Sequence, residues 1–435
     1  MHAHHDHSHG AGDWDDLTAA PVRRILTVIV VVVGVATVIG VLVWWPRGEL
    51  QVDRQALEFG DRFDATVTEA AVGPCSYDET VECNTVRFRL TEGPSSGTIG
   101  TLEASRAADT TAASLEAGDK IVVNDVGPDV DANARFSFAD MQRNSSLLLL
   151  GALFAGAVIA LGRLRGLLAL GGIAATLAIL VVYVFPALLH GSPPIGVAVS
   201  GTALMAYVVL YLAHGINGRT TVALIGTVAS LGLTALLAVA FAGFASLSGL
   251  ASEESVTLLA FAPQLDFRGL LVAAAIIGAL GVLDDVTVTQ VAAVWELHAS
   301  DPGTPARGLY AAASRIGRDH IASTVNTLVL AYSAAALPLL LLYTQSGLAF
   351  GEVLTNETVA VEIVQTLVGS IGLVASVPIT TALACWVVTR ADEPDQPPPP
   401  ARRRPMAVQS SRPPDFADDW SFLQPERPLR RPDLR

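Results

Sequence analysis

The stretch Gly278-Ala-Leu-Gly-Val-Leu-Asp-Asp-Val-Thr-Val-Thr-Gln-Val-Ala-Ala-Val-Trp-Glu-Leu-His298 places two adjacent carboxylates directly after an apolar run that begins at Leu270. Such a run is typical of a helix that crosses a membrane. A charged Asp at membrane depth costs about 2.5 kcal/mol or more, so it usually faces a polar cavity or a partner. We therefore expect a transmembrane helix that carries an acidic functional site.

Other apolar segments also have the length of a span, because a bilayer core of about 30 Å needs roughly 20 residues at 1.5 Å each. We expect an α-helical transmembrane bundle of about eight spans, with a seven-span region at 147–389. The expected spans are Ile25–Trp45, Leu147–Leu161, Leu167–Leu188, Ile195–His214, Val222–Leu247, Leu270–Val288, Ile321–Tyr343 and Val361–Val388. The first lacks an A-x-A cleavage site, so we expect 23–45 to be an uncleaved signal anchor.

The composition agrees with a membrane protein. Only 16% of the 435 residues are charged, whereas soluble chains carry about 25%. The 27 basic and 41 acidic residues give a net charge of −14. This balance argues against nucleic-acid binding, which needs a basic face.

Arginine placement predicts the orientation, because short cytoplasmic loops are enriched in Lys and Arg. If both termini are cytoplasmic, the loops around 189–194, 248–267 and 344–360 lie outside; they have no Lys or Arg except Arg268 at one edge. Their acidic residues are Glu253, Glu254, Asp266, Glu352 and Glu357. The cytoplasmic side then holds Arg23, Arg24, Arg163, Arg165, Arg219, Arg307, Arg315, Arg318 and Arg390. We expect a bacterial plasma-membrane protein with both termini inside.

Residues 46–146 separate the first two spans and have strand-like alternation. The segments starting at Phe63, Thr85 and Lys120 are divided by Gly-Pro and Gly-Asp turns. We expect a small all-β extracytoplasmic domain, an OB-like barrel. Cys75 and Cys83 flank a polar loop within it, and a disulfide is favoured over two free thiols because the compartment is oxidising.

The two ends of the chain have the composition of disordered tails. Residues 1–22 form a His-rich tail, and 390–435 form a Pro/Arg-rich tail that we expect to be cytoplasmic. No metal site is predicted with a fixed geometry, and adventitious binding is favoured over sensing. The weak metal-ligand candidates are His2, His4, His5, His7 and His9.

Helical spacing places Asp284 and Asp285 on different faces, about 100° apart. They therefore cannot form an aspartic-protease dyad, whose carboxylates share a proton. Carboxylates are costly as helix–helix contacts, so we interpret them as part of a transport path, whereas Ser, Thr and Gly faces favour helix packing. The predicted path residues are Asp284, Asp285, Thr289, Gln290, Glu296, Asn326, Glu362 and Gln365.

The segment from Glu296 to His320 has two readings. The favoured one is an amphipathic helix along the membrane surface. The other is a cytoplasmic gate whose arginines pair with Asp284, Asp285 or Glu296. The gate residues would be His298, Arg315, Arg318 and His320.

Three stretches, Leu283–Leu297, Gly317–Tyr332 and Glu362–Thr381, resemble the hallmark segments of the YibE/F family of bacterial multi-pass membrane proteins. The resemblance extends from about residue 61 to residue 389 and omits both tails. It implies an integral membrane protein with an exported N-terminal domain, and the single-chain arrangement is similar to that of actinobacterial members. It supplies no catalytic residues.

Two functions remain open. The first is a transporter or permease component for cation- or proton-linked passage. The second is a non-transporting platform or sensor whose domain 46–146 binds an envelope protein. No inverted repeat supports transport, while Walker, nucleophile-elbow, HExxH and CxxC signatures are absent. We expect no enzyme activity and no cofactor; the predicted partner is the lipid bilayer, and the oligomeric state stays open.

Overall fold

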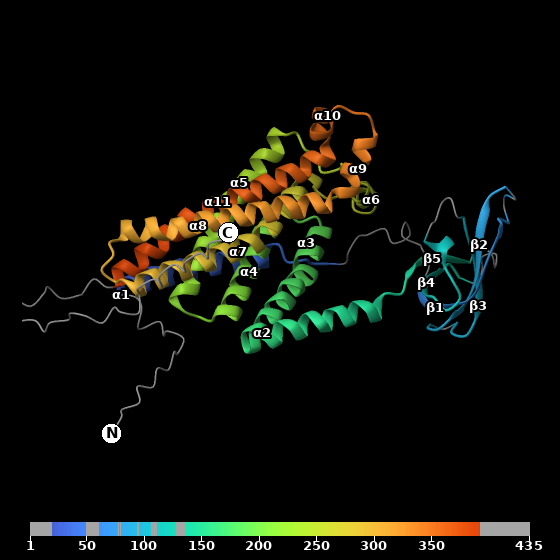
Figure 1. Ribbon diagram of the computed structural model, residues 1–435, viewed down its shortest axis with the longest axis horizontal. Coiled ribbons are helices and arrows are strands. Elements are labelled where there is room, and N and C mark those ends of the chain that lie inside the picture. The colour runs from blue at the N-terminus through green and yellow to red at the C-terminus, as the bar shows by residue number, and fades with distance from the viewer. Residues whose placement is uncertain are drawn as a thin grey trace, which may run out of the picture. The chain divides into compact units, whose positions relative to one another are not determined.

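The computed structural model describes residues 20–48, 61–76, 78, 80–93, 95–105, 111–127 and 135–391. The histidines of the N-terminal tail and nearly all of the C-terminal tail lie outside these residues. Within them are a five-stranded sheet and a set of long helices (Figure 1). Six helices are long and apolar enough to cross a membrane, or seven if one bent pair counts as a span. The multi-pass helical class is therefore confirmed, and the count of eight stays a prediction.

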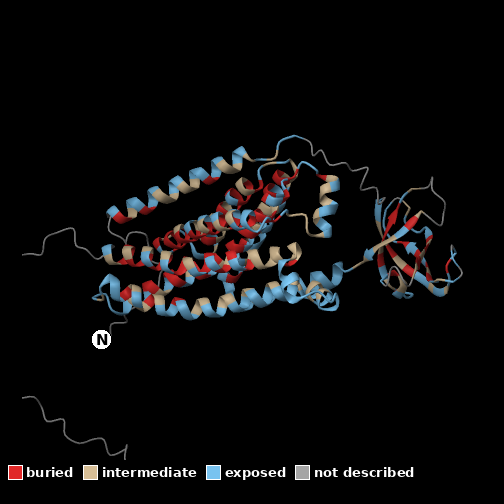
Figure 2. Ribbon diagram, turned by 90° about the horizontal axis from the view of Figure 1, so that it is seen from above, coloured by how far each residue is buried: buried red, intermediate tan, exposed pale blue. Residues whose placement is uncertain are grey.

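The helical region begins with α1 (Ala20–Val43) and continues after the sheet. The remaining elements are α2 (Asn144–Ile179), the π-helical turn η3 (Leu180–Val184), α3 (Phe185–Leu189), α4 (Pro194–His214), α5 (Gly218–Phe244), α6 (Glu253–Phe261), α7 (Phe267–Ser300), α8 (Ala306–Ala335), α9 (Leu337–Gln345), α10 (Phe350–Thr355) and α11 (Glu357–Ala391). Buried residues concentrate on the inner helices (Figure 2).

The segment Asn144–Leu189 joins two of the expected spans. Its 46 residues would be about 69 Å long as one straight helix, more than twice the thickness of a bilayer core. The helix breaks at Arg163, whose backbone has φ 51° and ψ −128°, and Figure 1 shows the two halves at an angle. The break falls between the predicted spans 147–161 and 167–188.

The structure corrects the favoured reading of Glu296–His320. This segment is not one surface helix. It contains the last turn of α7, the connection 301–305 and the first half of α8. Pro302 and Pro305 lie in the connection, where a proline cannot continue a helix interior. The expected span Ile321–Tyr343 is also interrupted, because α8 and α9 meet at a 62° bend.

Helices α5, α7 and α11 pack against one another as the central unit of the bundle. Close approach depends on glycine. A Cβ at Gly226 would lie 2.4 Å from Thr380 Oγ1, and one at Gly372 would lie 2.0 Å from Thr234 Oγ1. Small residues of this kind let transmembrane helices approach closely.

The arginine-bearing helix ends lie together. Val22, Val222, Trp295, Leu309 and Cys385 belong to one buried cluster, so the start of α1, α5 and α8 meets the end of α7 and α11. The loops predicted to lie on the opposite side also contact one another.

Two contacts join those opposite loops. Gln264 Nε2 donates to Leu189 O at 3.1 Å, and Glu357 Oε1 accepts from Gly249 N at 3.1 Å. The helices therefore alternate in direction as the arginine pattern predicts.

The β-domain is an antiparallel sheet with the order β3-β2-β1-β4-β5. Its strands are β1 (Asp61–Pro74), β2 (Glu82–Leu90), β3 (Ile99–Ser105), β4 (Lys120–Asp125) and β5 (Phe136–Met141), with a short 3-10 turn η2 (Ala112–Ser114). One face buries Val67, Val86, Phe88, Leu102 and Ile121. Within the described strands no ladder pairs β3 with β5, so the sheet is a half-barrel and a complete OB barrel stays a prediction.

Candidate functional site

Asp284 lies on the side of α7 that faces α5. Thr287, about 60° away around the helix, bonds Thr227 of α5 through their hydroxyls at 2.7 Å. Val291, about 20° from Asp284, packs in a cluster with Val222 and Ala223 of α5. Asp284 is half-buried, and its Oδ1 is a buried atom with no hydrogen-bond partner.

Buried hydroxyls lie on α5, α7 and α11, where these three helices contact one another. We define the polar seam by its six residues. They are Thr227, Ser230 and Thr234 of α5, Asp284 and Thr287 of α7, and Thr380 of α11, and all five hydroxyl residues are 0% exposed. Three of its buried oxygens lack a hydrogen-bond partner, on Ser230, Asp284 and Thr380. Buried polar atoms are normally satisfied, so an orphaned set indicates a place where water or an ion can bind.

The sequence analysis missed the α5 side of the seam. Thr227, Ser230 and Thr234 follow the spacing i, i+3, i+7, which places them on one helical face. The signal was available in the expected span Val222–Leu247. The spacing of these three hydroxyl residues predicts a polar face on an otherwise apolar helix.

Asp285 has different surroundings from Asp284. Its side chain is 73% exposed, and Oδ2 lies 3.9 Å from Nε2 of His320 on α8. Thr289 is also exposed and donates to the carbonyl of Asp285 at 2.8 Å. Gln290 is buried instead and donates to Ala313 O of α8 at 2.9 Å. The stretch Asp284–Gln290 thus faces both the core of the bundle and its surface.

Glu362 and Gln365 lie on α11 near a small internal cavity. The cavity has a volume of about 10 Å³ and is lined by Gly278, Tyr332, Gln365 and Thr366 among others. That space accommodates about one water molecule. Both Glu362 and Gln365 are half-buried, whereas Asn326 is exposed on the outer side of α8.

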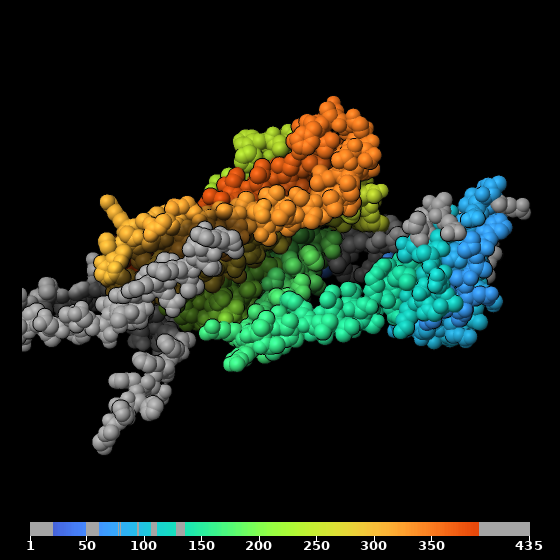
Figure 3. All heavy atoms as spheres, viewed as in Figure 1, coloured from blue at the N-terminus to red at the C-terminus, as the bar shows by residue number. Residues whose placement is uncertain are grey.

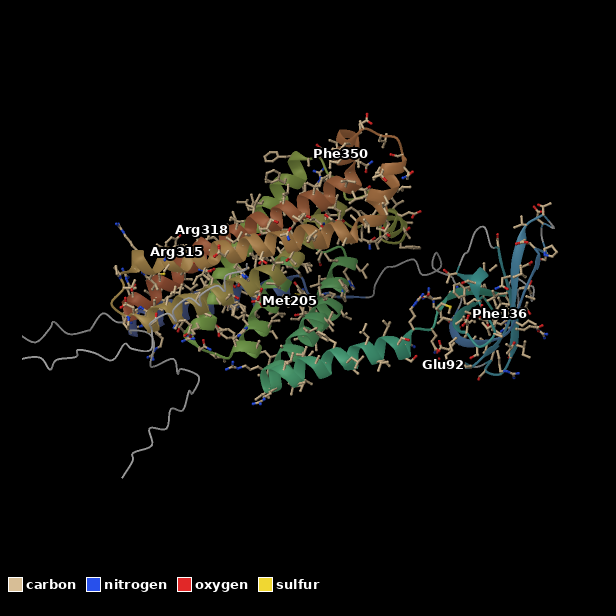
Figure 4. The ribbon with its side chains drawn as sticks, in the orientation of Figure 1. Glu92, Phe136, Met205, Arg315, Arg318 and Phe350 are labelled. Atoms are coloured by element: carbon tan, nitrogen blue, oxygen red, sulfur yellow. A yellow bond between two sulfur atoms is a disulfide. The ribbon has the colours of Figure 1, made fainter. Side chains whose placement is uncertain are left out.

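The proposed gate residues do not pair as the gate reading predicts. Glu296 Oε1 lies 3.5 Å from Arg219 Nη1, and both side chains are largely exposed. Among the described side chains, the ion pairs of Asp285 and Glu296 are with His320 and Arg219 and include neither Arg315 nor Arg318. Both arginines are exposed on α8 (Figure 4), and His298 is half-buried.

The comparison with family profiles decides the identity. A profile described as YibE/F-like protein matches residues 150–390, more than half of the chain. The chain belongs to the YibE/F-like family. In this YibE/F-like chain the match covers every element from α3 to α8 and all of the polar seam. It begins after β5, so the β-domain, which the sequence resemblance included, lies outside the matched region.

The comparisons with curated proteins and with solved structures found no match. The YibE/F-like assignment therefore rests on the family profile. It supplies no substrate, so the chemistry of the site has to be argued from the seam.

In the β-domain a disulfide joins Cys75 to Cys83, the favoured of the two readings. Glu103 of β3 lies beside it and accepts hydrogen bonds from the backbone N and the hydroxyl of Ser76. Because both sulfurs are in the disulfide, they cannot act as thiolate metal ligands.

Proposed function

We propose that this YibE/F-like protein is a transporter or permease component in the bacterial plasma membrane, with Asp284 as the acidic centre of a cation- or proton-linked path. The supporting observation is the polar seam, with orphaned buried oxygens on α5, α7 and α11. A carboxylate and buried hydroxyl oxygens on adjoining helices are oxygen ligands of the kind that suits a hard cation, or a proton carried through water.

The depth of Asp284 supports this role. Glu296 and Arg219 pair at the arginine-bearing end of the bundle. Asp284 precedes Glu296 by twelve residues, so it lies about 18 Å further along the helix. A carboxylate at that depth needs water, a cation or a proton to compensate its charge.

The arginine pattern supports an orientation with both termini in the cytoplasm, as the positive-inside rule requires. In that orientation the seam is reached from the cytoplasm past Arg219 and Glu296. His298, Arg315, Arg318 and His320 would border this entrance rather than close it, and the path would continue past Glu362 and Gln365.

The experiment is flux through purified protein in liposomes, followed with a pH-sensitive dye and with cation-selective dyes. Asp284→Asn is expected to lower the flux about tenfold or more, because it removes the charge that compensates the permeating ion. Ser376→Ala is the control, since Ser376 on α11 is as buried as the hydroxyls of the polar seam but its own hydroxyl bonds Leu373 O of its own helix at 2.8 Å. Full flux in a well-folded Asp284→Asn protein would contradict the proposed role of Asp284.

A second function is favoured by one feature of the β-domain. A hollow of about 660 Å³ lies between β3 and β5, lined by Thr101, Glu103, Phe136 and Phe138 among others. Unpaired strand edges accept an extended peptide as an added strand. This feature supports a platform or sensor that binds an envelope protein.

Deletion separates the two functions. Replacing residues 61–141 by a short flexible linker is expected to leave liposome flux unchanged if the chain is a transporter. The same deletion is expected to abolish the cellular function of a platform, while Asp284→Asn leaves that function intact.

A further inference from the structure

The exposed surface of α8 carries polar and charged side chains, which are unfavourable in contact with lipid hydrocarbon. Helix α8 packs on α7 and α11 and continues into α9. Its exposed polar residues are Arg315, Arg318, Asp319, Ser323, Asn326 and Thr327, and they alternate with the exposed apolar residues Ile316, Val329 and Leu330. By contrast, the exposed residues of α1 are Val31, Val35, Ile39 and similar apolar side chains, as hydrocarbon requires.

Contacts with α7 place Ser323, Asn326 and Thr327 at membrane depth, whereas the charged residues of α8 lie nearer the arginine-bearing end. Ala313 accepts a hydrogen bond from Gln290, and His320 lies beside Asp285. Further along α8, Tyr332 borders the cavity at Gly278, inside the apolar run of α7. Asn326 lies on α8 between His320 and Tyr332. It is about 20 Å along the helix axis from Ala313. Ala313 itself belongs to the buried cluster at the arginine-bearing end.

The flank of α7 beside α8 extends the same surface. Asp285 and Thr289 are exposed there, with His320 joining the two helices. We call the set Asp285, Thr289, Arg315, Asp319, Ser323, Asn326 and Thr327 the α7–α8 polar face. No helix of the described chain covers it, and Figure 3 shows α8 (gold) at the surface.

We propose that a second copy of this chain covers the α7–α8 polar face, so that the protein is a homo-oligomer in the membrane. Polar groups at bilayer depth face a partner or water rather than hydrocarbon. The face carries both signs of charge, with Arg315 and Asp319 at i, i+4 on α8 and Asp285 on the flank of α7. A two-fold interface brings the same patch of two subunits together, so opposite charges can meet across it.

Amide and hydroxyl groups add a second reason. Asn326, Ser323 and Thr327 can hydrogen-bond across a helix–helix interface in the membrane. Their placement along one exposed arc fits two α8 helices side by side. This inference does not depend on a transport function, since the α7–α8 polar face of a non-transporting platform would also need a partner in the membrane.

The experiment is cysteine cross-linking in native membranes of cells that co-express two differently tagged copies. Asp319, Ser323 and Asn326 are each replaced by Cys in a Cys385→Ala background, and a flexible bis-maleimide is added. The expected product has twice the 45.4 kDa monomer mass and carries both tags. Leu236→Cys on the exposed apolar face of α5 is the control and is expected to give no product.

The alternative outcomes are distinct. Products of another mass would mean that a different protein covers the face, and the proposal would be wrong. Cysteines that only a water-soluble maleimide labels would assign the face to an aqueous cavity, which also overturns it. Gel filtration of each variant excludes misfolding, and the three positions together guard against one unfavourable geometry.

Discussion

The β-domain and the α5–α7–α11 unit arrange polar and apolar residues in opposite ways. The sheet buries Val67, Phe88 and Ile121 against one another, as a water-soluble domain does. The helical unit buries Thr227 and Thr234 while Leu236 of α5 is 65% exposed. The β-domain therefore has the residue distribution of a domain in water, and the helical unit has that of a bundle in lipid.

This contrast has an energetic consequence. In the sheet the apolar core supplies the stability, because burial removes apolar surface from water. Between membrane helices lipid is as apolar as leucine, so close packing and interhelical hydrogen bonds hold the unit together. Substitutions should therefore destabilise the β-domain mainly through lost hydrophobic burial. In the helical unit they should act mainly through disturbed packing and interhelical hydrogen bonds.

The largest effect is expected for Phe88→Ala. Phe88 is fully buried and meets Phe136 edge-on, with ring centroids 5.2 Å apart. Its truncation should destabilise the β-domain by about 3–5 kcal/mol, measured by limited proteolysis of the full chain across a urea series. Val72→Ala, at a side chain that is 58% exposed, is the control. An equal effect at both positions would contradict an apolar core.

A smaller effect is expected for Gly372→Ala in the helical unit. The new Cβ would lie 2.0 Å from Thr234 Oγ1, and overpacking of this kind costs about 1–3 kcal/mol. The melting temperature in detergent should fall. Gly369→Ala on the same helix meets nothing within 4 Å, so it should leave the melting temperature unchanged or raise it. A harmless Gly372→Ala would contradict the close α5–α11 contact.

How far the sequence predicted the structure differs between these regions. The strands and most spans followed from alternation and apolar length, and α4 begins one residue from the predicted Ile195. Helix packing was less predictable, because lipid-facing and buried faces are both apolar and hydrophobic periodicity cannot separate them. The break at Arg163 falls between two predicted spans, whereas the continuation of α7 to Ser300 was missed.

The candidate site was predicted in part. Asp284 was selected together with Asp285 because two adjacent carboxylates directly after an apolar run stand out. The buried hydroxyls of α5 were not selected, since serine and threonine are common in transmembrane helices and only their spacing distinguishes them. The pairing of Glu296 with Arg219 was also missed, because it depends on which helix ends meet in space.

The smallest effect is expected from acidification of the β-domain. Hydrogen bonds from Arg135 lower the pKa of Asp125 below its ordinary value of 3.8, with a smaller contribution from Gly127 N–H, although burial raises it. A lowered folded pKa means that the ion pair stabilises the domain above about pH 4 and that this stability is lost as the pH falls through the lower value. Protease resistance of the domain should therefore drop below pH 4.

Asp125→Asn is the matched variant for that titration. It should lower protease resistance at pH 7 and flatten its dependence on pH below 4. Glu69→Gln, which alters an exposed pair with Arg87 at 3.5 Å, should leave the profile unchanged. An unchanged profile in Asp125→Asn would show that another group carries the titration.

The most direct measurement of the central claim is the access of water to the polar seam. Ser230→Cys in a Cys385→Ala background is treated in membranes with a small charged methanethiosulfonate reagent, alongside Leu236→Cys on the exposed face of the same helix. A water-connected seam predicts that Ser230→Cys is modified faster than Leu236→Cys, and that an excess of the permeating cation slows the reaction. Modification of Ser230→Cys no faster than the lipid-facing control would mean that the hydroxyls only pack helices together.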